Sequence, residues 1–108
     1  MKLLEGKSAI VTGSGRGIGR AVATLFAEHG AEVVVNDLDG ETAEGVANSI
    51  NAAGGVATTC VGSVTAPDFA ERVVQTAVQE FGKLDIIVNN AGYTWDGVIQ
   101  NVTDEMWD

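Results

Sequence analysis

The sequence predicts an α/β fold in which parallel strands alternate with helices around a single sheet. Two patterns support this prediction: short apolar runs such as Val33-Val34-Val35 recur along the chain, and the stretches between them show the helical spacing of apolar residues. A third observation is the segment SAIVTGSGRGIGR at residues 8–20, in which an apolar strand runs through a glycine-rich turn into a helix. Parallel strand-helix-strand units with right-handed crossovers then leave few topologies.

Glycines and capping residues bound the individual elements. Strands are expected at residues 8–12, 32–37, 56–61 and 84–89. Helices are expected at 17–29, at 41–53 behind a cap at Asp39, from the segment 65–68 to a stop at Gly82, and from 103 onward. The apolar face of the first helix is expected to consist of Ile18, Ala21, Val22, Leu25 and Phe26.

The glycine-rich turn follows the first strand, which predicts a doubly wound sheet with the strand order 3-2-1-4. The first two helices should cover one face of the sheet and the third helix the other, so that the fold has three layers. A bound nucleotide should lie where the chain reverses direction between the third and fourth strands, over the carboxyl ends of the first and fourth.

Size and charge restrict the function. The 108 residues suffice for one domain, and 15 acidic against 6 basic residues give a formal charge of −9. This balance argues against nucleic acid and against an anionic membrane surface as partners, since both attract basic proteins. The single cysteine, Cys60, fits a reducing compartment, and we expect a cytoplasmic protein with neither a signal peptide nor a membrane span. No metal site is expected from the spacing of His, Cys, Asp and Glu.

The turn after the first strand has the features of a phosphate site. Helix N-termini present unpaired N–H groups, and glycines let the backbone approach a diphosphate closely. The spacing G-x-G-x-x-G is absent, because Ile18 stands where its third glycine would fall; the spacing present is T-G-x-x-x-G-x-G, from Thr12 to Gly19. An ordinary glycine-rich loop is the competing interpretation. The residues expected to form the cofactor turn are Gly13, Ser14, Gly15, Arg16, Gly17, Ile18 and Gly19.

Asp37 ends the second predicted strand, 18 positions after Gly19. A carboxylate at this place accepts hydrogen bonds from both hydroxyls of an adenosine ribose and repels a 2′-phosphate, so it favours NAD over NADP. Arg16 in the turn can offset that repulsion, which leaves NADP as an alternative. The competing interpretation of Asp37 is a helix cap or a solvated strand end, although Asp39 is equally placed to act as the cap.

A second motif, Asn89-Asn90-Ala91-Gly92, follows the fourth predicted strand. Together with T-G-x-x-x-G-x-G and the phrase FGKLDIIVNNAG, it makes the chain similar to the N-terminal part of the short-chain dehydrogenase/reductase family, which has a Rossmann fold, and particularly to its 3-oxoacyl-carrier-protein reductases. The motif suggests that Asn89 ties strands together and that Asn90 contacts the cofactor, and the resemblance adds Ala91 and Gly92 to the cofactor site. It also assigns the adenine edge to residues 63 and 64, where Ser63 replaces the usual Asp or Asn and leaves more of the contact to Val64.

The resemblance implies an NAD(P)-dependent oxidoreductase that acts on a small alcohol or carbonyl compound and, at full length, forms a homo-oligomer. Residues 1–108 would be its cofactor-binding part, truncated before strands 5–7, because the sequence contains no Tyr-x-x-x-Lys of the catalytic set. No catalytic residue is therefore expected here, and these residues alone are expected to be inactive. A 3-oxoacyl thioester and a broader range of secondary alcohols fit equally well as substrates. Two other functions stay open: a non-catalytic nucleotide-binding module, and another Rossmann enzyme such as a methyltransferase.

Overall fold

The computed structural model describes residues 2–90, in which strands and helices alternate as the sequence predicts. The elements are, in chain order, β1 (Ser8–Val11), α1 (Gly17–Glu28), β2 (Glu32–Asp37), α2 (Gly40–Ala52), β3 (Val56–Val61), α3 (Phe69–Phe81) and β4 (Ile86–Val88). The predicted bounds of β2 and β3 agree with the structure, and those of β1, α1 and α2 differ by one residue at one or both ends. The helix predicted from residue 103 lies outside the described residues.

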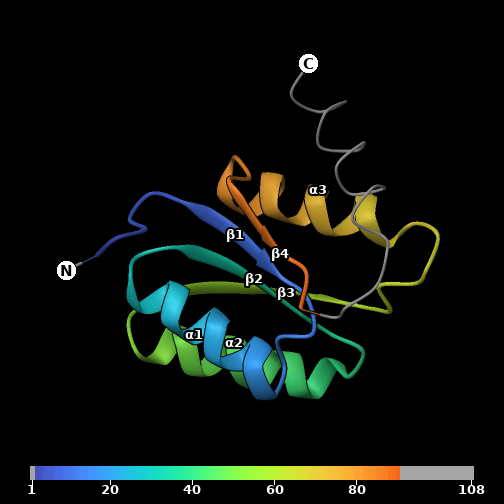
Figure 1. The fold of residues 1–108 in the computed structure, drawn as a ribbon, viewed down its shortest axis with the longest axis horizontal. Helices are drawn as coiled ribbons and strands as arrows, with labels where there is room; N and C mark the ends of the chain where they lie inside the picture. Colours follow the sequence, from blue (N-terminus) through green and yellow to red (C-terminus); the bar gives the residue numbers. More distant parts are fainter. Residues whose placement is uncertain (1, 91–108) are drawn as a thin grey trace.

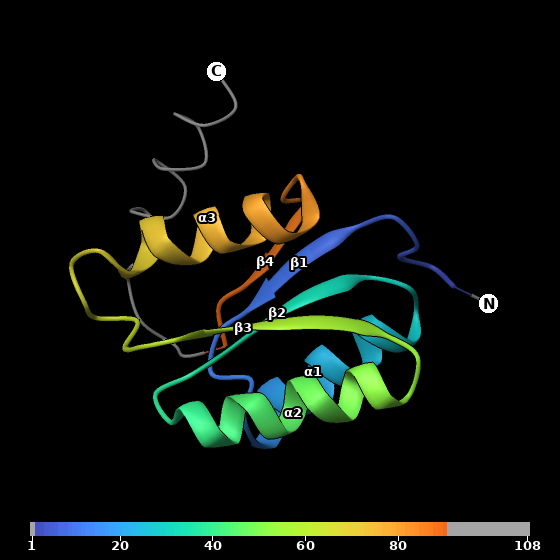
Figure 2. The same cartoon turned by 180° about the vertical axis from the view of Figure 1, so that it is seen from behind.

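The four strands form one parallel sheet in the order β3-β2-β1-β4, which confirms the predicted topology. Figure 1 shows α1 and α2 together on one face of the sheet and α3 on the opposite face, and Figure 2 shows the same layers from behind. The fold is therefore the expected three-layer, doubly wound Rossmann arrangement. The carboxyl ends of β1 and β4 lie at its topological switch point, where folds of this kind bind their ligands.

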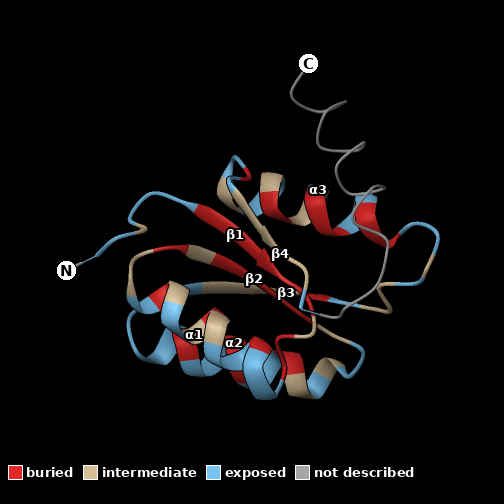
Figure 3. Cartoon of the chain, viewed as in Figure 1, coloured by how far each residue is buried: buried red, intermediate tan, exposed pale blue. Residues whose placement is uncertain are grey.

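Two apolar clusters bury the sheet on its two faces (Figure 3). Alternate residues of β2 face opposite sides: Val34 packs with α3, whereas Val33 and Val35 pack with α1 and α2. All three of these side chains are fully buried. A continuous run of β-branched residues is typical of a parallel strand that is covered on both faces, and this is why β2 lies inside the sheet rather than at its edge.

Small residues, rather than the predicted large apolar face, bring α1 against the sheet. The buried positions of α1 are Gly19, Ala23 and Ala27, spaced four residues apart, while Ile18 and Leu25 are 76% and 52% exposed. Of the predicted face, Ile18, Ala21 and Leu25 are exposed and only Val22 and Phe26 are half-buried. The prediction was wrong because periodicity gives most weight to bulky side chains, whereas the distance between a helix and its neighbours depends on the residues at the line of contact.

The segment predicted to begin the third helix forms turns instead, and α3 begins only at Phe69. The Ser63 hydroxyl accepts a hydrogen bond from the Thr65 N–H at 3.1 Å, and the Ser63 carbonyl accepts one from the Ala66 N–H at 3.0 Å. Such local bonds from a serine compete with helix formation. Asp68 then precedes α3 without a side-chain cap bond. The predicted helix start at 65–68 was therefore wrong by one turn.

The end of α3 and the bounds of β4 define the last part of the described chain. Gly82 ends α3 in a left-handed conformation with φ of 81°, as predicted from its position. The strand predicted at 84–89 is limited to Ile86–Val88. Asp85 bonds to Ser8 at the start of β1, and Asn90 bonds to the turn after β1.

Candidate functional site

The turn between β1 and α1 places the backbone of Gly13 and Gly17 at the end of the sheet. Both have positive φ angles, 60° and 62°, which residues with a side chain rarely adopt. Arg16 occupies the N-cap position of α1 with an extended backbone and makes no side-chain cap bond. The first N–H groups of α1 therefore receive no cap from Arg16 and are directed along the helix axis toward the turn, where they favour an anion.

Close contact between α1, the turn and β4 depends on Gly19. A Cβ at this position would lie 2.9 Å from the carbonyl carbon of Gly13 and 2.6 Å from Nδ2 of Asn90. Asn90 donates from Nδ2 to the Gly13 carbonyl oxygen at 3.2 Å, and the Thr12 hydroxyl donates to Oδ1 of Asn89 at 3.4 Å. The two asparagines therefore join the end of β4 to the end of β1 and to the turn. The predicted contacts Ala91 and Gly92 lie outside the described residues.

Ser14 supports the turn from beneath. Its side chain is fully buried, and its hydroxyl donates to the Val11 carbonyl at 2.7 Å and accepts from the Asn36 N–H at 2.9 Å. The Ser14 N–H donates to the Asn36 carbonyl at 2.7 Å. Both the hydroxyl and the N–H of Ser14 are thus engaged within the protein, and they hold the turn against β2.

Asp37 is held by its two oxygen atoms at the end of β2. Oδ2 accepts a hydrogen bond from the Gly15 N–H at 3.2 Å, and Oδ1 accepts one from the Asp39 N–H at 3.2 Å. Gly15 lies so close that a Cβ on it would come within 2.8 Å of the Asp37 carboxyl carbon and within 2.7 Å of Cγ2 of Thr42. The carboxylate of Asp37 is therefore fixed in direct contact with the glycine-rich turn.

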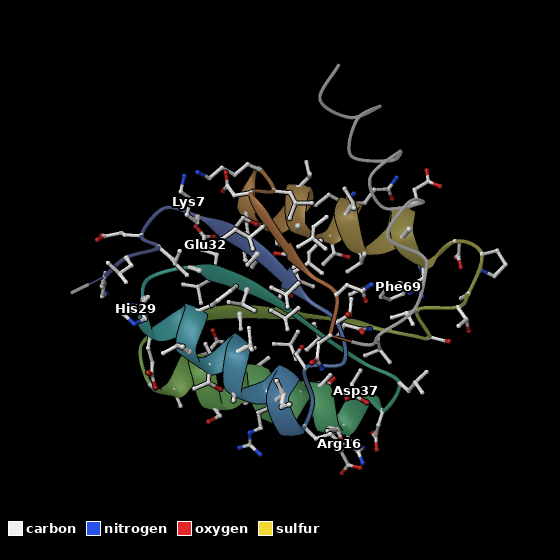
Figure 4. All side chains as sticks on the ribbon, viewed as in Figure 1. Lys7, Arg16, His29, Glu32, Asp37 and Phe69 are labelled. Atoms are coloured by element: carbon white, nitrogen blue, oxygen red, sulfur yellow. The ribbon has the colours of Figure 1, made fainter. Side chains whose placement is uncertain are left out.

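Asp39 caps α2, as predicted, and carries a second negative charge next to Asp37. Its side chain accepts hydrogen bonds from the N–H groups of Glu41 and Thr42 at 3.0 and 3.3 Å. Hydrogen bonds from Thr42 hold the pKa of Asp39 below its usual value, and the positive charge of Arg16 acts in the same direction. Figure 4 shows Arg16 and Asp37 at the same end of the sheet. One cation and two carboxylates thus lie together beside the turn.

The loop after β3 forms the opposite side of the site. The hydroxyls of Ser63 and Thr65 are 2.6 Å apart and share a hydrogen bond. Val64 is half-buried and packs against the apolar cluster under α3. Arg72 of α3 donates from Nη1 to the Val61 carbonyl at 3.2 Å and stacks over the ring of Phe69, with 5.7 Å from its guanidinium carbon to the ring centroid. The loop is therefore braced by α3.

A cavity of about 500 Å³ lies between the turn, the end of β2 and the loop after β3, a volume within the usual range for small-molecule sites. Its lining residues are Gly13, Arg16, Asn36, Asp37, Leu38, Asp39, Gly62, Ser63, Val64 and Thr65. The predicted residues Gly13, Arg16, Asp37, Ser63 and Val64 are thus brought together from three separate segments. The other described predicted residues, Ser14, Gly15, Gly17, Ile18, Gly19 and Asn90, belong to the turn, the first residues of α1 and the end of β4.

Sequence reasoning missed two residues of this cavity in particular. Leu38 is apolar yet 72% exposed at the cavity edge. The feature of the sequence that could have indicated it is a single leucine between two aspartates in a polar turn. Asn36 is only 1% exposed. The feature of the sequence that could have indicated it is an amide side chain directly after the apolar run of β2. A buried amide needs hydrogen-bond partners, but the sequence alone does not say which segments supply them.

Comparison with known proteins assigns this architecture. A model of the family described as short chain dehydrogenase matches residues 7–108. The chain belongs to the short-chain dehydrogenase family. This membership confirms the resemblance indicated by the glycine motif at residues 12–19 and the asparagine motif at residues 89–92. It also removes the alternative of a methyltransferase.

Relatives and solved structures agree with the assignment. The chain is 37% identical to a 3-oxoacyl-(acyl-carrier-protein) reductase of Thermotoga maritima, over 97% of this chain and 43% of the relative. It is 41% identical to a peroxisomal hydratase-dehydrogenase-epimerase of Neurospora crassa, over 96% of this chain and 12% of that protein. The crystal structure of a hydroxysteroid dehydrogenase from Escherichia coli superposes with a TM-score of 0.80 at 42% identity, over 83% of this chain and 38% of that one. The chain thus spans less than half the length of these relatives.

Two further kinds of feature are absent from the described residues 2–90. None of their helices is long and apolar enough to cross a membrane. Within the same range, no three side chains of His, Cys, Asp or Glu are grouped so that they could hold a metal ion.

Proposed function

We propose that this chain is the cofactor-binding part of an NAD(P)-dependent oxidoreductase that interconverts an alcohol and a carbonyl compound, with NAD as the preferred cofactor. Family membership supports the reaction class. The observation that carries the cofactor assignment is the Asp37 carboxylate, which is fixed by the Gly15 N–H beside a cavity of about 500 Å³. The residues present fit a dinucleotide, because the cavity joins a phosphate-binding turn to a carboxylate suited to a ribose.

The diphosphate would be bound by the turn and the N-terminus of α1. Gly13 and Gly17 expose backbone that carries no side chain, and the N–H groups at the start of α1 favour negative charge. Arg16 lines the same cavity and can bring its guanidinium to a phosphate. Gly19 keeps α1 close enough to the turn for these groups to act on one ligand.

Selection of NAD over NADP follows from the charges around the ribose position. Asp37 already accepts two hydrogen bonds, and a carboxylate has about four lone-pair positions. It therefore has capacity for the hydroxyls of an adenosine ribose. A 2′-phosphate would instead meet the charges of Asp37 and Asp39, which line the same cavity as Arg16. The net charge of these three groups is negative, which opposes the phosphate.

The adenine would lie between Leu38 and the loop after β3. Leu38 offers an exposed apolar surface at the cavity edge, and Val64 lines the opposite side. Apolar side chains on both faces of a planar base bury its surface and exclude water. The Ser63 hydroxyl is bonded to Thr65, so it contributes less to the amino edge of adenine than a carboxylate or amide would.

When bound, the nicotinamide ring supplies the hydride chemistry that relates alcohol to carbonyl. The names of two matches, a 3-oxoacyl reductase and a hydroxysteroid dehydrogenase, refer to compounds that carry a ketone or an alcohol. We propose the same class of substrate for the whole protein. These 108 residues contain no Tyr-x-x-x-Lys. Their own part is to bind and orient the cofactor, without transferring hydride by themselves.

For the full-length enzyme we propose a homo-oligomer in a reducing compartment, the cytoplasm. The single cysteine of these residues, Cys60, is buried and unpaired, which supports the compartment. A non-catalytic nucleotide-binding module is the second candidate function, because the glycine-rich turn, Asp37 and the cavity between them would serve either protein. Reading the coding sequence beyond codon 108 separates the two candidates, since the enzyme requires that motif downstream and the module does not.

Titration of the purified chain with NADH and with NADPH tests the cofactor assignment. We expect NADH to bind at least about tenfold more tightly, which corresponds to about 1.4 kcal/mol. Asp37→Ser should weaken NADH binding and reduce the preference for NADH over NADPH. The matched control is Glu80→Gln, which also removes one negative charge but at an exposed position on α3, and it should alter neither quantity. Absence of saturable binding of either dinucleotide would refute the assignment, and a preference for NADPH would reverse the proposed selectivity.

A further inference from the structure

The side chain of Asn36 connects the two walls of the cavity. Its Oδ1 accepts a hydrogen bond from the Gly13 N–H at 3.0 Å, in the turn after β1. Its Nδ2 donates to the carbonyls of Cys60 at 3.0 Å and Gly62 at 3.2 Å, where the chain leaves β3. One buried amide thus bonds to both segments that enclose the proposed cofactor, the phosphate turn and the loop that leads to Ser63.

The groups around Asn36 match an amide and no other side chain of this size. They are one N–H donor, which needs an acceptor, and two carbonyl oxygens, which need donors. An aspartate would keep the bond to Gly13 but would set a carboxylate against two carbonyl oxygens. A serine is too short to reach both walls. Either change removes hydrogen bonds from backbone groups that are buried or partly buried, which favours movement of the wall that has lost its bond.

The exit of β3 depends on side chains because β3 is an edge strand, with β2 as its only neighbour in the described sheet. Asn36 holds the Cys60 and Gly62 carbonyls from inside the fold, and Arg72 holds the Val61 carbonyl between them from α3. The Gly62 N–H donates to the Asp37 carbonyl at 3.1 Å. The direction of the chain toward Ser63 and Val64 is therefore set at three successive carbonyls.

We propose that Asn36 is a positioning residue that sets the separation between the phosphate turn and the adenine wall, and thereby the affinity for ligands that contact both. The proposal rests on the proposed function, since it presumes that a nucleotide occupies this cavity. Although Asn36 lines the cavity, its amide oxygen and nitrogen are both engaged within the protein. Asn36 acts through Gly13 on the diphosphate side and through Gly62 on the adenine side.

Asn51 provides a matched control within the same chain. Its Nδ2 donates to the Ala57 carbonyl at 3.1 Å, and its Oδ1 accepts from the Ala57 N–H at 2.8 Å. It therefore fixes the beginning of β3 by the same chemistry with which Asn36 fixes the end of β3. A general weakening of β3 would follow from either substitution, whereas an effect on the separation of the cavity walls would follow only from changes at Asn36.

The test compares two ligands in four proteins: wild type, Asn36→Asp, Asn36→Ser and Asn51→Ser. In the proposed binding mode, ADP-ribose would contact both walls, while adenosine would contact the adenine wall and carries no diphosphate. Dissociation constants are measured by calorimetry, and thermal unfolding establishes that each variant is folded. We expect both Asn36 variants to lose about tenfold or more in affinity for ADP-ribose and less than about threefold for adenosine, since small misplacements of binding groups cost affinity steeply. Asn51→Ser should bind both ligands as wild type does.

Each other outcome has a defined meaning. Equal losses for the two ligands, or an equal effect of Asn51→Ser, would overturn the proposal, because they would show a general loss of structure. Failure of both Asn36 variants to fold would overturn it as well, since Asn36 would then serve the fold rather than the site. If folded Asn36 variants bind ADP-ribose like wild type, the positioning role fails while the proposed function stands. If wild type binds neither ligand, the proposed function itself fails.

Discussion

The side-chain amide of Asn90 donates a hydrogen bond to the carbonyl oxygen of Gly13 at 3.2 Å, across 77 positions of sequence. This contact joins the end of β4 to the turn after β1, and α1 lies against both because Gly19 has no side chain. The two motifs that mark the family in the sequence are therefore one structural unit. Changes at Gly19 should disturb the unit without removing any polar group.

Gly19→Ala should destabilise the fold by about 1–3 kcal/mol, the usual cost of inserting a methyl group into a packed interior. The added Cβ would lie 2.6 Å from Nδ2 of Asn90 and 2.9 Å from the carbonyl carbon of Gly13, so α1 must move away from the turn. NADH affinity should fall as well. Urea unfolding and NADH titration measure the two effects.

Gly45→Ala is the control for that change, because Gly45 is exposed within α2 and an added Cβ there meets nothing within 4 Å. Removing a glycine from a helix interior should raise the free energy of unfolding by about 1 kcal/mol. Opposite signs for the two substitutions are expected. A Gly19→Ala protein with wild-type stability and wild-type NADH affinity would contradict the close packing of α1 on the turn.

Gly15→Ala should weaken NADH binding and reduce discrimination against NADPH. The new Cβ would collide with Oδ2 of Asp37 and lie 2.7 Å from Cγ2 of Thr42, so the carboxylate must leave its bond with the Gly15 N–H. Titrations with both dinucleotides give the ratio of affinities. Gly45→Ala again controls for the general effect of adding a methyl group, and an unchanged ratio in Gly15→Ala would show that the position of Asp37 does not depend on the turn.

The individual strands and helices could be predicted because their determinants are local in the sequence. The Val33-Val34-Val35 run specifies a doubly covered strand, and Gly82 ends α3 where its left-handed backbone requires a glycine. The same holds for the cap at Asp39, whose partners are only two and three residues away. Local signals of this kind can be recognised in a single sequence without knowledge of the rest of the fold.

The contacts that complete the site could not be predicted, because their partners are remote in the chain. Asn36 bonds to Gly13, 23 positions before it, and to Cys60 and Gly62, 24 and 26 positions after it. Nothing in the dipeptide Asn36-Asp37 indicates which segments supply these partners. The prediction of which residues form the core face of α1 was wrong for a related reason. Its small residues matter only once the sheet lies against them, and Ile18 and Leu25 carry a stronger apolar signal than Ala23.

Ser14→Ala should lower the free energy of unfolding by about 1–3 kcal/mol, the cost of leaving a buried group without its hydrogen bond. The hydroxyl of Ser14 is the acceptor for the Asn36 N–H at 2.9 Å, in a fully buried position. Ser49→Ala, an exposed change on α2, is the matched control and should have little effect. Chemical denaturation measures both. A loss of NADH affinity in Ser14→Ala without any loss of stability would instead indicate direct contact with the ligand.

Acid should weaken the link between the starts of β1 and β4, which depends on Asp85. The Asp85 carboxylate accepts a hydrogen bond from the Ser8 N–H at 2.9 Å, and Lys83 lies 3.5 Å away. The Ser8 bond is the main cause that lowers the pKa of Asp85 below its ordinary 3.8, with Lys83 and Lys7 adding to it against the opposing effect of burial. A carboxyl whose pKa is lowered on folding stabilises the fold above pH 3.8, and this stability is lost as the pH falls through the lowered value.

Asp85→Asn should therefore reduce stability by about 0.5–1 kcal/mol at pH 7, a modest figure because the side chain is partly exposed to solvent. The difference from wild type should persist down to about pH 4 and then shrink at lower pH, as the wild-type carboxyl also becomes neutral. Urea denaturation between pH 7 and pH 2.5 measures this difference, with Glu80→Gln on α3 as the control for the loss of one exposed charge. A difference that stays constant over the whole range would show that the charge of Asp85 does not strengthen its bond to Ser8.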